Sequence, residues 1–598
     1  MSIVNPAASL SNRRSIWSVN LTSSSWRMAS VFLATLLPAS MIVALIFHYG
    51  VDVPYWDEWS LIDLLSKAHT HQLSFADLSA QHNEHRLIFP KLLFLALDQV
   101  NHWSPRAEMF LSVSLCTVSA FCLQKLLWQT FCGGWQRMFV IALVMNLLLF
   151  SPCQHENWLW GFQLGCFLLN LCLLVGVAVI CSDLSPTFKV FSVAGCALVA
   201  TFSGGNGMLL WPLFLVTFLL RREFSNRRAT IYWFIAWTLI GTAMIALYFA
   251  NYRKPVPSAP LVVSNNLLDY LSYLLAFVGS SLSRRDAMSL APSLWIGAGE
   301  LTAFSILFGV LVCHRRNNAL LRKAAPWLAI AAFALLTAIM VCTTRIGLGP
   351  MQALSSRYTT FSLLFIISLI ALGLVIEETF TGKKATLVRN FNFGVLLLIV
   401  GLFVSTLPID IKNMSDTRDS RTLARVAVAF LKCLPQKNLL EGQVFPNLGE
   451  LTRLAERAAA LHLLSPPPLE LSNLQHFLNS KQSSEESCGA FDPVQKSGRN
   501  WYVASGWARF PHKRPAADAI VLTFREAGKE NTPFALGFPV IAQNIASFLK
   551  DGPKVGTEWK AIFSRESISQ GGMVEIRAWV CDVEQLRFCK LDGSYRLE

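Results

Sequence analysis

The chain has 598 residues, of which 53% are hydrophobic and 15% are charged, and its formal net charge is +14 at pH 7. Soluble domains average about 25% charged residues, so this composition excludes an ordinary soluble protein and predicts a polytopic α-helical membrane protein. The basic residues lie in short segments between apolar runs, as the positive-inside rule describes. We therefore attribute the positive charge to membrane topology and expect no nucleic-acid partner.

Apolar runs follow one another through residues 1–408, and a helix needs about 20 apolar residues to cross a bilayer. The first run, 28–49, is too long for a signal-peptide core and is expected to be an uncleaved anchor. The run 264–282 is interrupted by polar residues and is expected to be re-entrant or interfacial. About eleven spanning helices are expected, at 28–49, 107–128, 136–150, 159–181, 187–202, 208–220, 230–250, 292–313, 325–343, 358–377 and 391–408.

The basic loops set the expected orientation of the chain. With the N-terminus in the cytoplasm, the cytoplasmic loops contain Arg137 and the basic segments 221–228, 314–323 and 383–389. An odd number of helices then places residues 409–598 outside the cytoplasm. The expected location is a bacterial inner membrane, with the C-terminal part in the periplasm or outside the cell.

The chain changes character after the last apolar run. Residues 409–495 are expected to form a helical linker, because much of this segment has helical periodicity. Residues 496–598 alternate apolar and polar positions as strands do, and a β-sandwich is expected there. Outside the cytoplasm cysteines can form disulfides, and we expect a bridge between Cys581 and Cys589. The candidate cysteines are Cys433, Cys488, Cys581 and Cys589.

The segment PYWDEWS, residues 54–60, places two adjacent carboxylates, Asp57 and Glu58, between two tryptophans just after the first apolar run. Such a pair can act as a general base or bind a divalent cation, because partial burial raises the pKa of a carboxyl group toward a useful value. The structural alternative is a helix start, since acidic residues are favoured in a first turn and tryptophan at the membrane interface. A functional role of the acidic pair is favoured over a simple helix start, because four more polar segments fall on the same expected outer face. These are 81–86, 151–158, 202–207 and 344–358.

The segment QHNEHR, residues 81–86, contributes two histidines, an arginine and a glutamate. His82, His85 and Arg86 have the spacing of a shared helix face, and Glu84 is expected to point elsewhere. The expected role is hydrogen bonding to a polar or phosphorylated substrate. A zinc site is a weaker alternative, because a third clear ligand is missing, and a plain solvated loop is another.

Two further segments add candidate binding residues. In SPCQHENW, His155 and Glu156 stand at the mouth of a helix, where an ordinary capped helix start is the alternative. In TRIGLGPMQALSSRY, Arg345 ends one apolar run, and Arg357 and Tyr358 begin the next. Arginine forks match phosphate geometry, and arginines on the outer face depart from the positive-inside trend. A lipid phosphate would explain them; a structural ion pair with the acidic pair is the alternative.

The acidic pair after the first spanning helix resembles the first-loop acidic motif of GT-C fold glycosyltransferases. That class includes protein O-mannosyltransferases and the enzyme that adds aminoarabinose to lipid A. The RY of SSRY, with Arg345 before it, is similar to bacterial members of the class. The resemblance covers residues 1–408 and implies a transmembrane catalytic domain there. Because Asp57 and Glu58 are adjacent and lack the D-x-D spacing of some members, metal dependence stays open and a divalent cation is an alternative.

The resemblance implies an inverting transfer of a sugar from a polyprenyl-phosphate donor in the bilayer to an envelope glycan, lipid or protein acceptor. Asp57 is implied as the base for the acceptor hydroxyl, and Glu58 as the group that orients the acceptor or holds a cation. Arg345 and Arg357 would hold the departing phosphate. The histidines expected to line the sugar site are His82, His85 and His155.

Other classes of membrane protein fit parts of the same pattern. A transporter or flippase of lipid-linked glycans would also place arginines and carboxylates along a path, but typically at the bilayer midplane. Here the ionisable residues lie at helix ends on one side, which favours an interfacial enzyme. A polymerase, ligase or acyltransferase with the same topology, and a scaffold whose C-terminal domain binds a partner, are the remaining alternatives.

Overall fold

The computed structural model of this chain contains two compact units. It describes residues 24–131, 133–222, 227–254, 266–283, 289–479, 487–510, 517–526, 529–540, 557–568 and 573–597. The first unit, here called the membrane unit, consists of Met1–Leu45, Val113–Gln154 and Cys166–Ile409. The second, here called the loop unit, consists of Ile46–Ser112, His155–Gly165 and Asp410–Glu598.

Nine helical segments among the described residues are long and apolar enough to cross a membrane. In chain order they contain α1 (Ser24–Tyr49), α5 (Pro105–Thr130), α6 (Trp135–Leu149), α8 (Leu164–Ile180), α11 (Arg227–Phe249), α13 (Ala291–Cys313), α14 (Asn318–Arg345), α15 (Ser356–Glu377) and α16 (Gly382–Ala429). The expected spans 187–202 and 208–220 are the shorter helices α9 (Pro186–Thr201) and α10 (Leu210–Arg221), so a count of eleven is not confirmed.

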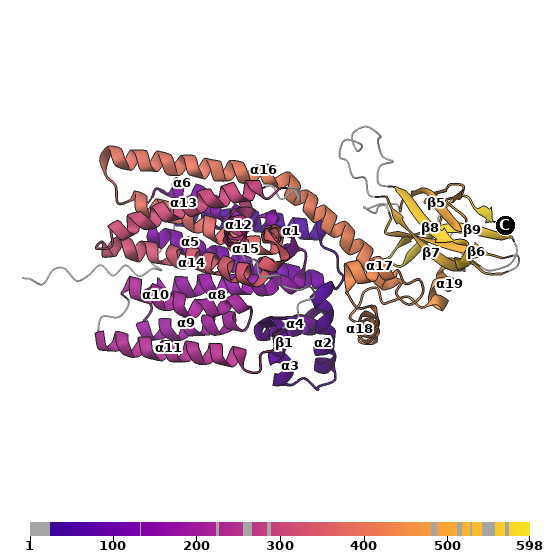
Figure 1. Ribbon diagram of the computed structural model, residues 1–598, viewed down its shortest axis with the longest axis horizontal. Helices are drawn as coiled ribbons and strands as arrows, with labels where there is room; N and C mark the ends of the chain where they lie inside the picture. Colours follow the sequence, from indigo (N-terminus) through magenta and orange to yellow (C-terminus); the bar gives the residue numbers. More distant parts are fainter. Residues whose placement is uncertain are drawn as a thin grey trace, which may run out of the picture. The chain divides into compact units, whose positions relative to one another are not determined.

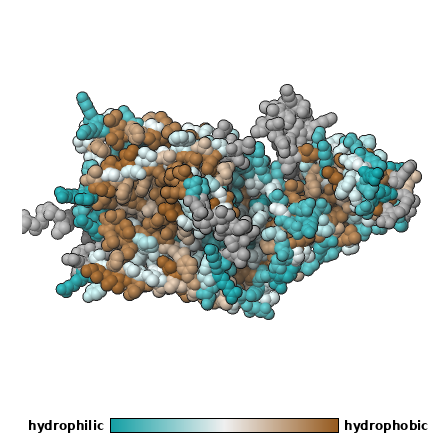
Figure 2. All heavy atoms as spheres, in the orientation of Figure 1, coloured by the Kyte–Doolittle hydropathy of each residue, from teal (hydrophilic) through white to brown (hydrophobic). Residues whose placement is uncertain are grey.

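The surface of these helices is compatible with a polytopic membrane protein. Large apolar side chains such as Trp295 on α13 and Phe391 on α16 are exposed, as lipid-facing residues would be. Figure 2 shows predominantly hydrophobic residues on the visible face of the helical bundle, with hydrophilic residues at the helix ends. Helix α15, by contrast, is buried almost throughout its length and forms the centre of the bundle.

The run 264–282 contains a helix, α12 (Leu267–Gly279), that packs closely against α13. Two glycines make this approach possible. A Cβ atom at Gly279 would lie 2.2 Å from the carbonyl oxygen of Ser293, and one at Gly297 would lie 2.0 Å from the carbonyl oxygen of Leu275. The two backbones therefore meet where neither helix carries a side chain, as small residues allow in membrane helix packing.

Replacing Gly297 by Ala is expected to destabilise the membrane unit by about 1–3 kcal/mol, because α12 and α13 must separate to admit the methyl group. Thermal unfolding of the detergent-purified chain measures the effect. Gly309 on the same helix has open space at its Cβ position, so Gly309→Ala is the control and should be neutral or slightly stabilising. Equal melting temperatures for the two variants would contradict the close contact.

The loop unit contains most of the short elements of the chain. Its helical elements before the sheet are η1 (Trp56–Ser60), α2 (Leu61–His69), α3 (Phe75–Ser79), α4 (Ile88–Asn101), α7 (His155–Trp158), η3 (Gly161–Gln163), α17 (Lys437–Leu439), η8 (Leu440–Val444), α18 (Leu448–Ala460) and α19 (Leu471–Asn479). A small hairpin, β1 (Gln81–His82) and β2 (His85–Arg86), precedes α4. Trp59, Leu65 and Phe94 form a core with residues of α16 and α18.

The expected helix face shared by His82, His85 and Arg86 is wrong, because these residues lie in the antiparallel hairpin. His82 pairs directly with His85 across it. Asn83 in the turn has φ +47°, a left-handed conformation that tight hairpin turns use and that asparagine tolerates better than most residues. The turn chemistry overrides the helical spacing, which had too few apolar positions to support it.

Helix α16 continues through the predicted boundary at residue 408, and its last turns are shared by two cores of the loop unit. Ala424, Ala427 and Val428 pack into the core with the first loop. Val426 and Ala429 pack against the sheet. At 100° per residue these two sets lie on opposite sides of the helix. The segment expected as a linker therefore begins inside a continuous helix that both cores need.

The C-terminal strands form one nine-stranded sheet that curves into a half-barrel (Figure 1), where two stacked sheets of a β-sandwich were expected. Its longest path is β10-β9-β6-β7-β8-β5-β3, with β11 beside β9 and β4 beside β5, and every described strand pair is antiparallel. The strands are β3 (Gly489–Phe491), β4 (Gln495–Lys496), β5 (Trp501–Ala508), β6 (Ala519–Arg525), β7 (Thr532–Pro539), β8 (Glu558–Ser564), β9 (Val574–Asp582), β10 (Arg587–Lys590) and β11 (Tyr595–Leu597).

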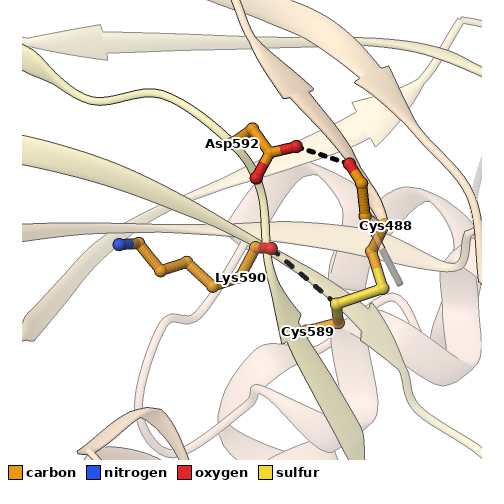
Figure 3. The surroundings of a disulfide bond; sticks show 5 residues. Cys488, Cys589, Lys590 and Asp592 are labelled. Carbon is orange, nitrogen blue, oxygen red and sulfur yellow. Dashed lines mark hydrogen bonds between the residues drawn. A yellow bond between two sulfur atoms is a disulfide. The ribbon is translucent and has the colours of Figure 1, made fainter. Parts of the chain in front are cut away.

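The expected bridge between Cys581 and Cys589 is wrong: Cys589 is bonded to Cys488 (Figure 3), with 6.3 Å between the Cα atoms. Cys581 in β9 pairs with Phe588 in β10, and Cys589 pairs with Val580. Because neighbouring positions along a strand point to opposite faces, Cys581 and Cys589 lie on opposite faces of the sheet. Accordingly, Cys589 packs in the core inside the half-barrel and Cys581 in the core with α16 and α19.

Candidate functional site

Most of the residues that were expected to form a functional site lie in the loop unit. Eight of the eleven belong to it: Asp57, Glu58, His82, Glu84, His85, Arg86, His155 and Glu156. The other three belong to the membrane unit: Arg345, Arg357 and Tyr358. The loop-unit residues come from η1, the hairpin and α7.

Glu58 is a buried carboxyl group that holds two segments of backbone together. Its Oε2 accepts a hydrogen bond from the Tyr55 N–H at 2.8 Å, and its Oε1 accepts one from the Phe162 N–H at 2.9 Å. The first bond closes the start of η1, as the structural interpretation of the acidic pair predicts. The second ties the first loop to the segment after α7. Removal from water raises the pKa of Glu58 to about 8, against the lowering effect of these donors and of Arg421.

Asp57 is the accessible member of the acidic pair, with 35% of its side chain exposed. Its Oδ1 lies 3.6 Å from His82 Nε2, and the Asn83 side-chain amide approaches the same oxygen at 3.4 Å. Trp56, immediately before it, has φ +45°, a strained conformation for a bulky residue. Backbone strain of this kind is concentrated at functional sites.

The hairpin supplies two histidines with different surroundings. His82 packs against the Phe162 ring, with 5.2 Å between ring centroids, and its Nδ1 lies 3.4 Å from the Ser60 hydroxyl. Loss of hydration lowers the pKa of His85 to about 4, so this imidazole is neutral at physiological pH. Arg86 donates to the Ser79 carbonyl at 2.7 Å and thereby anchors the hairpin. Glu84, in the turn, is half-buried.

A cavity of about 230 Å³ lies next to the hairpin. Its polar lining includes Ser60, Gln81, His82 and Lys91. Lys91 donates to three backbone carbonyls, those of residues 77, 78 and 80, at 2.9–3.1 Å. Burial lowers the pKa of its ammonium group to about 8. His82 is therefore in contact with both Asp57 and a small cavity that combines hydrogen-bonding groups with apolar walls.

Arg421, from α16, is a site residue that the sequence analysis did not identify. Its guanidinium carbon lies 3.0 Å from the centroid of the Tyr55 ring, and it is nearly buried. It interacts electrostatically with Glu58 and Glu156, so a cation from a distant part of the chain lies beside these two carboxyl groups. A cation–π contact of this kind is stronger when desolvated. The local signal was the pair of arginines, Arg421 and Arg425, in the largely apolar segment RTLARVAVAF.

The remaining predicted residues are placed as helix-end groups. His155 and Glu156 are half-buried in the four-residue helix α7. In the membrane unit, Arg345 is the last residue of α14 and Arg357 lies in the first turn of α15. Tyr358 stacks on Phe277 with 5.4 Å between centroids, and the Arg357 guanidinium carbon lies 5.8 Å from the Tyr358 ring. Tyr358 is thus a packing residue as well as a neighbour of the arginine.

The described residues contain no group of three or more His, Cys, Asp or Glu side chains that could hold a metal ion. His82 and His85, the pair considered for zinc, face each other across the hairpin without a third such ligand in that part of the structure. Both carboxyl oxygens of Glu58 already accept backbone hydrogen bonds. A divalent cation at the acidic pair would therefore have Asp57 as its most accessible protein ligand.

Comparisons with protein-family models, with curated proteins and with solved structures give no match for this chain. The resemblance to GT-C glycosyltransferases accordingly stays a prediction carried by the first-loop acidic pair and the arginine-containing segments. Any assignment of function rests on the residues of the site and on their geometry.

Burial of Glu58 predicts a pH-dependent stability. Between its ordinary pKa of 4.5 and about 8, the folded chain keeps a proton on Glu58 that the unfolded chain has lost, so the free energy of unfolding falls as pH rises through this window. The loss is at most about 5 kcal/mol, at 1.36 kcal/mol per pKa unit. Thermal unfolding at pH 5.5, 7 and 8.5 should show this slope for the natural chain and a smaller one for Glu58→Gln. An identical slope in the two proteins would remove Glu58 as its source.

Proposed function

We propose that this protein is an inverting membrane glycosyltransferase that moves a sugar from a polyprenyl-phosphate donor to an envelope glycan, lipid or protein acceptor. The observation that carries the proposal is the division of roles within the acidic pair. Glu58 is buried and holds two backbone N–H groups, whereas Asp57 is partly exposed beside His82. One carboxyl group belongs to the framework and the other is available to a substrate.

The chemistry of the transfer requires one base and little else from the protein at the reacting atoms. The acceptor hydroxyl oxygen forms a bond to the anomeric carbon, and the bond from that carbon to the phosphate oxygen breaks. The hydroxyl proton passes to Asp57, and the bonding electrons leave with the phosphate. Because attack and departure occur on opposite faces, the anomeric configuration inverts. His82, 3.6 Å from Asp57, acts as a positioning residue for the carboxylate.

The surroundings of Asp57 support a sugar or another polyhydroxy compound as the neighbouring ligand. The 230 Å³ cavity beside His82 offers a hydroxyl, an amide and an imidazole next to the Phe94 and Phe162 side chains. Such a mixture of a few placed polar groups and apolar walls is typical of small-molecule sites. The resemblance to GT-C enzymes assigns Arg345 and Arg357 to the donor phosphate, and separate variants of these arginines can test that role.

The direct test uses the full chain in membranes of a bacterial expression host, supplied with a panel of polyprenyl-phosphate sugars. Mass spectrometry of envelope glycans, lipids and proteins should show a mass increase of one sugar residue with a particular donor. Host membranes without the chain are the control. Movement of the intact donor across the membrane without sugar transfer would favour a flippase, and joining of lipid-linked glycans to each other would favour a polymerase or ligase.

A further inference from the structure

The membrane unit contains a large groove of about 1060 Å³, lined mainly by residues of α6, α13, α15 and α16. Isoleucine, leucine and phenylalanine side chains form most of its lining. Representative lining residues are Ile306 on α13, Ile370 on α15, and Phe393 and Leu398 on α16. The groove is far larger than the cavity of the loop unit and its apolar walls suit a hydrocarbon chain.

One end of the groove is basic. Arg137, from the first turn of α6, and Arg389, from the first turns of α16, both line it. Arg137 is held in place by two hydrogen bonds of 2.7 Å to the Glu377 carboxylate, which Asn392 also contacts at 3.1 Å. Arg389 is exposed and forms no ion pair with a described carboxylate within 4.0 Å. The two arginines and Glu377 leave a net positive charge, which matches a single anionic headgroup.

The groove also contains an intramembrane carboxyl group. Glu300 on α13 lines it, and both of its carboxyl oxygens are buried yet accept no hydrogen bond from the described residues. An ionisable residue within a spanning helix is expensive and marks a functional site by default. Gly299, beside it in the lining, has nothing within 4 Å of its Cβ position, so the space next to Glu300 is open.

We propose that this groove binds a phosphate-bearing acyl lipid, an acidic glycerophospholipid, as a bound structural ligand of the membrane unit. Arg389 binds the phosphate, and the acyl chain lies against α13 and α16 and passes Glu300 deeper in the groove. The site is independent of the proposed glycosyl transfer, because its residues all belong to the membrane unit and none is assigned to that reaction.

The length of the groove favours an acyl lipid over a long isoprenoid. Its α16 lining extends from Arg389 to Leu402, which corresponds to about 20 Å at 1.5 Å per residue. One leaflet of a bilayer provides about half of the 30 Å hydrocarbon thickness, so an acyl chain of leaflet length fits within this span. The basic end also lies at helix ends that the charge distribution assigns to the cytoplasmic side, opposite to the expected transfer site.

Native mass spectrometry of the purified full chain tests the proposal. After removal of bound lipid with detergent, the chain is titrated with phosphatidylglycerol, phosphatidylcholine or polyprenyl phosphate. Phosphatidylglycerol should give a saturable adduct of one lipid. Gly299→Trp, which fills the open space, should abolish it, and Arg389→Gln should weaken it about tenfold.

Matched controls separate groove filling from loss of fold. Gly309→Trp adds the same side chain to α13 at another position with open space that does not line the groove, and Lys384→Gln removes a neighbouring cation of α16. Both should bind lipid as the natural chain does. Equal retention of lipid by Gly299→Trp and Gly309→Trp, or equal binding of phosphatidylcholine, would overturn the proposal. Stronger binding of polyprenyl phosphate in the groove would also overturn it and would make the groove part of a donor site.

Discussion

Asp57→Asn is expected to lower sugar transfer by about 10²–10⁴-fold, the usual contribution of a positioned general base. Asparagine keeps the size of the side chain and its contact distance to Asn83 and His82, but its amide cannot take the acceptor proton. The measurement is product formation per unit of membrane-inserted protein with the donor identified from the panel. A small residual rate of transfer is expected, because an acceptor hydroxyl can lose its proton slowly without the help of Asp57.

The substitution at Asp57 should leave the fold intact, because the residue is partly exposed and both backbone bonds of the acidic pair are made by Glu58. The free energy of unfolding, measured by thermal unfolding, should therefore change by no more than about 0.5 kcal/mol. Asp416→Asn is the matched control, since it removes an exposed carboxylate of the same unit that pairs only with Lys412 among the described cations. Full transfer activity in Asp57→Asn would exclude Asp57 as the base while leaving the lipid groove unaffected.

Arg425→Met is expected to destabilise the contact between α16 and the sheet by about 3–5 kcal/mol. Arg425 is 8% exposed and lies 3.6 Å from Asp518, which is 1% exposed, and 3.2 Å from Glu584. Asp518 also accepts the Val583 N–H at 2.9 Å. Removing the cation leaves the Asp518 charge buried without the guanidinium, and such uncompensated charges account for losses of this size. Limited proteolysis and thermal unfolding of the purified chain measure this loss of stability.

A double substitution distinguishes the buried charge from a mere loss of packing. Adding Asp518→Asn to Arg425→Met removes the charge while keeping an oxygen that can accept the Val583 N–H. Most of the stability should return, because replacing both partners of a buried ion pair is often close to neutral. If the double variant were as unstable as Arg425→Met, the loss would instead come from the arginine's own packing against the sheet.

The positions of the apolar helices could be predicted from the sequence. The expected spans 28–49 and 358–377 differ from α1 and α15 by a few residues at one end. Hydropathy over about 20 residues is a local property of the chain, and a membrane-crossing helix satisfies its backbone within that same stretch. The alternation in the C-terminal region located the strands for the same reason. It could not distinguish a β-sandwich from one curved sheet, because strand pairing joins residues far apart in the sequence.

The candidate site was predictable only in part. The sequence alone identified the acidic pair, the histidines and their common region, since these depend on residue type and spacing. Only the tertiary structure made Glu58 a buried framework group and left Asp57 accessible, because the backbone N–H of Phe162 and the charge of Arg421 arrive from distant segments. The same holds for Cys488 and Cys589, which are 101 positions apart. Contacts that close such long loops carry no signature in the local sequence pattern, and they decided which of two neighbouring carboxylates is buried and which is accessible.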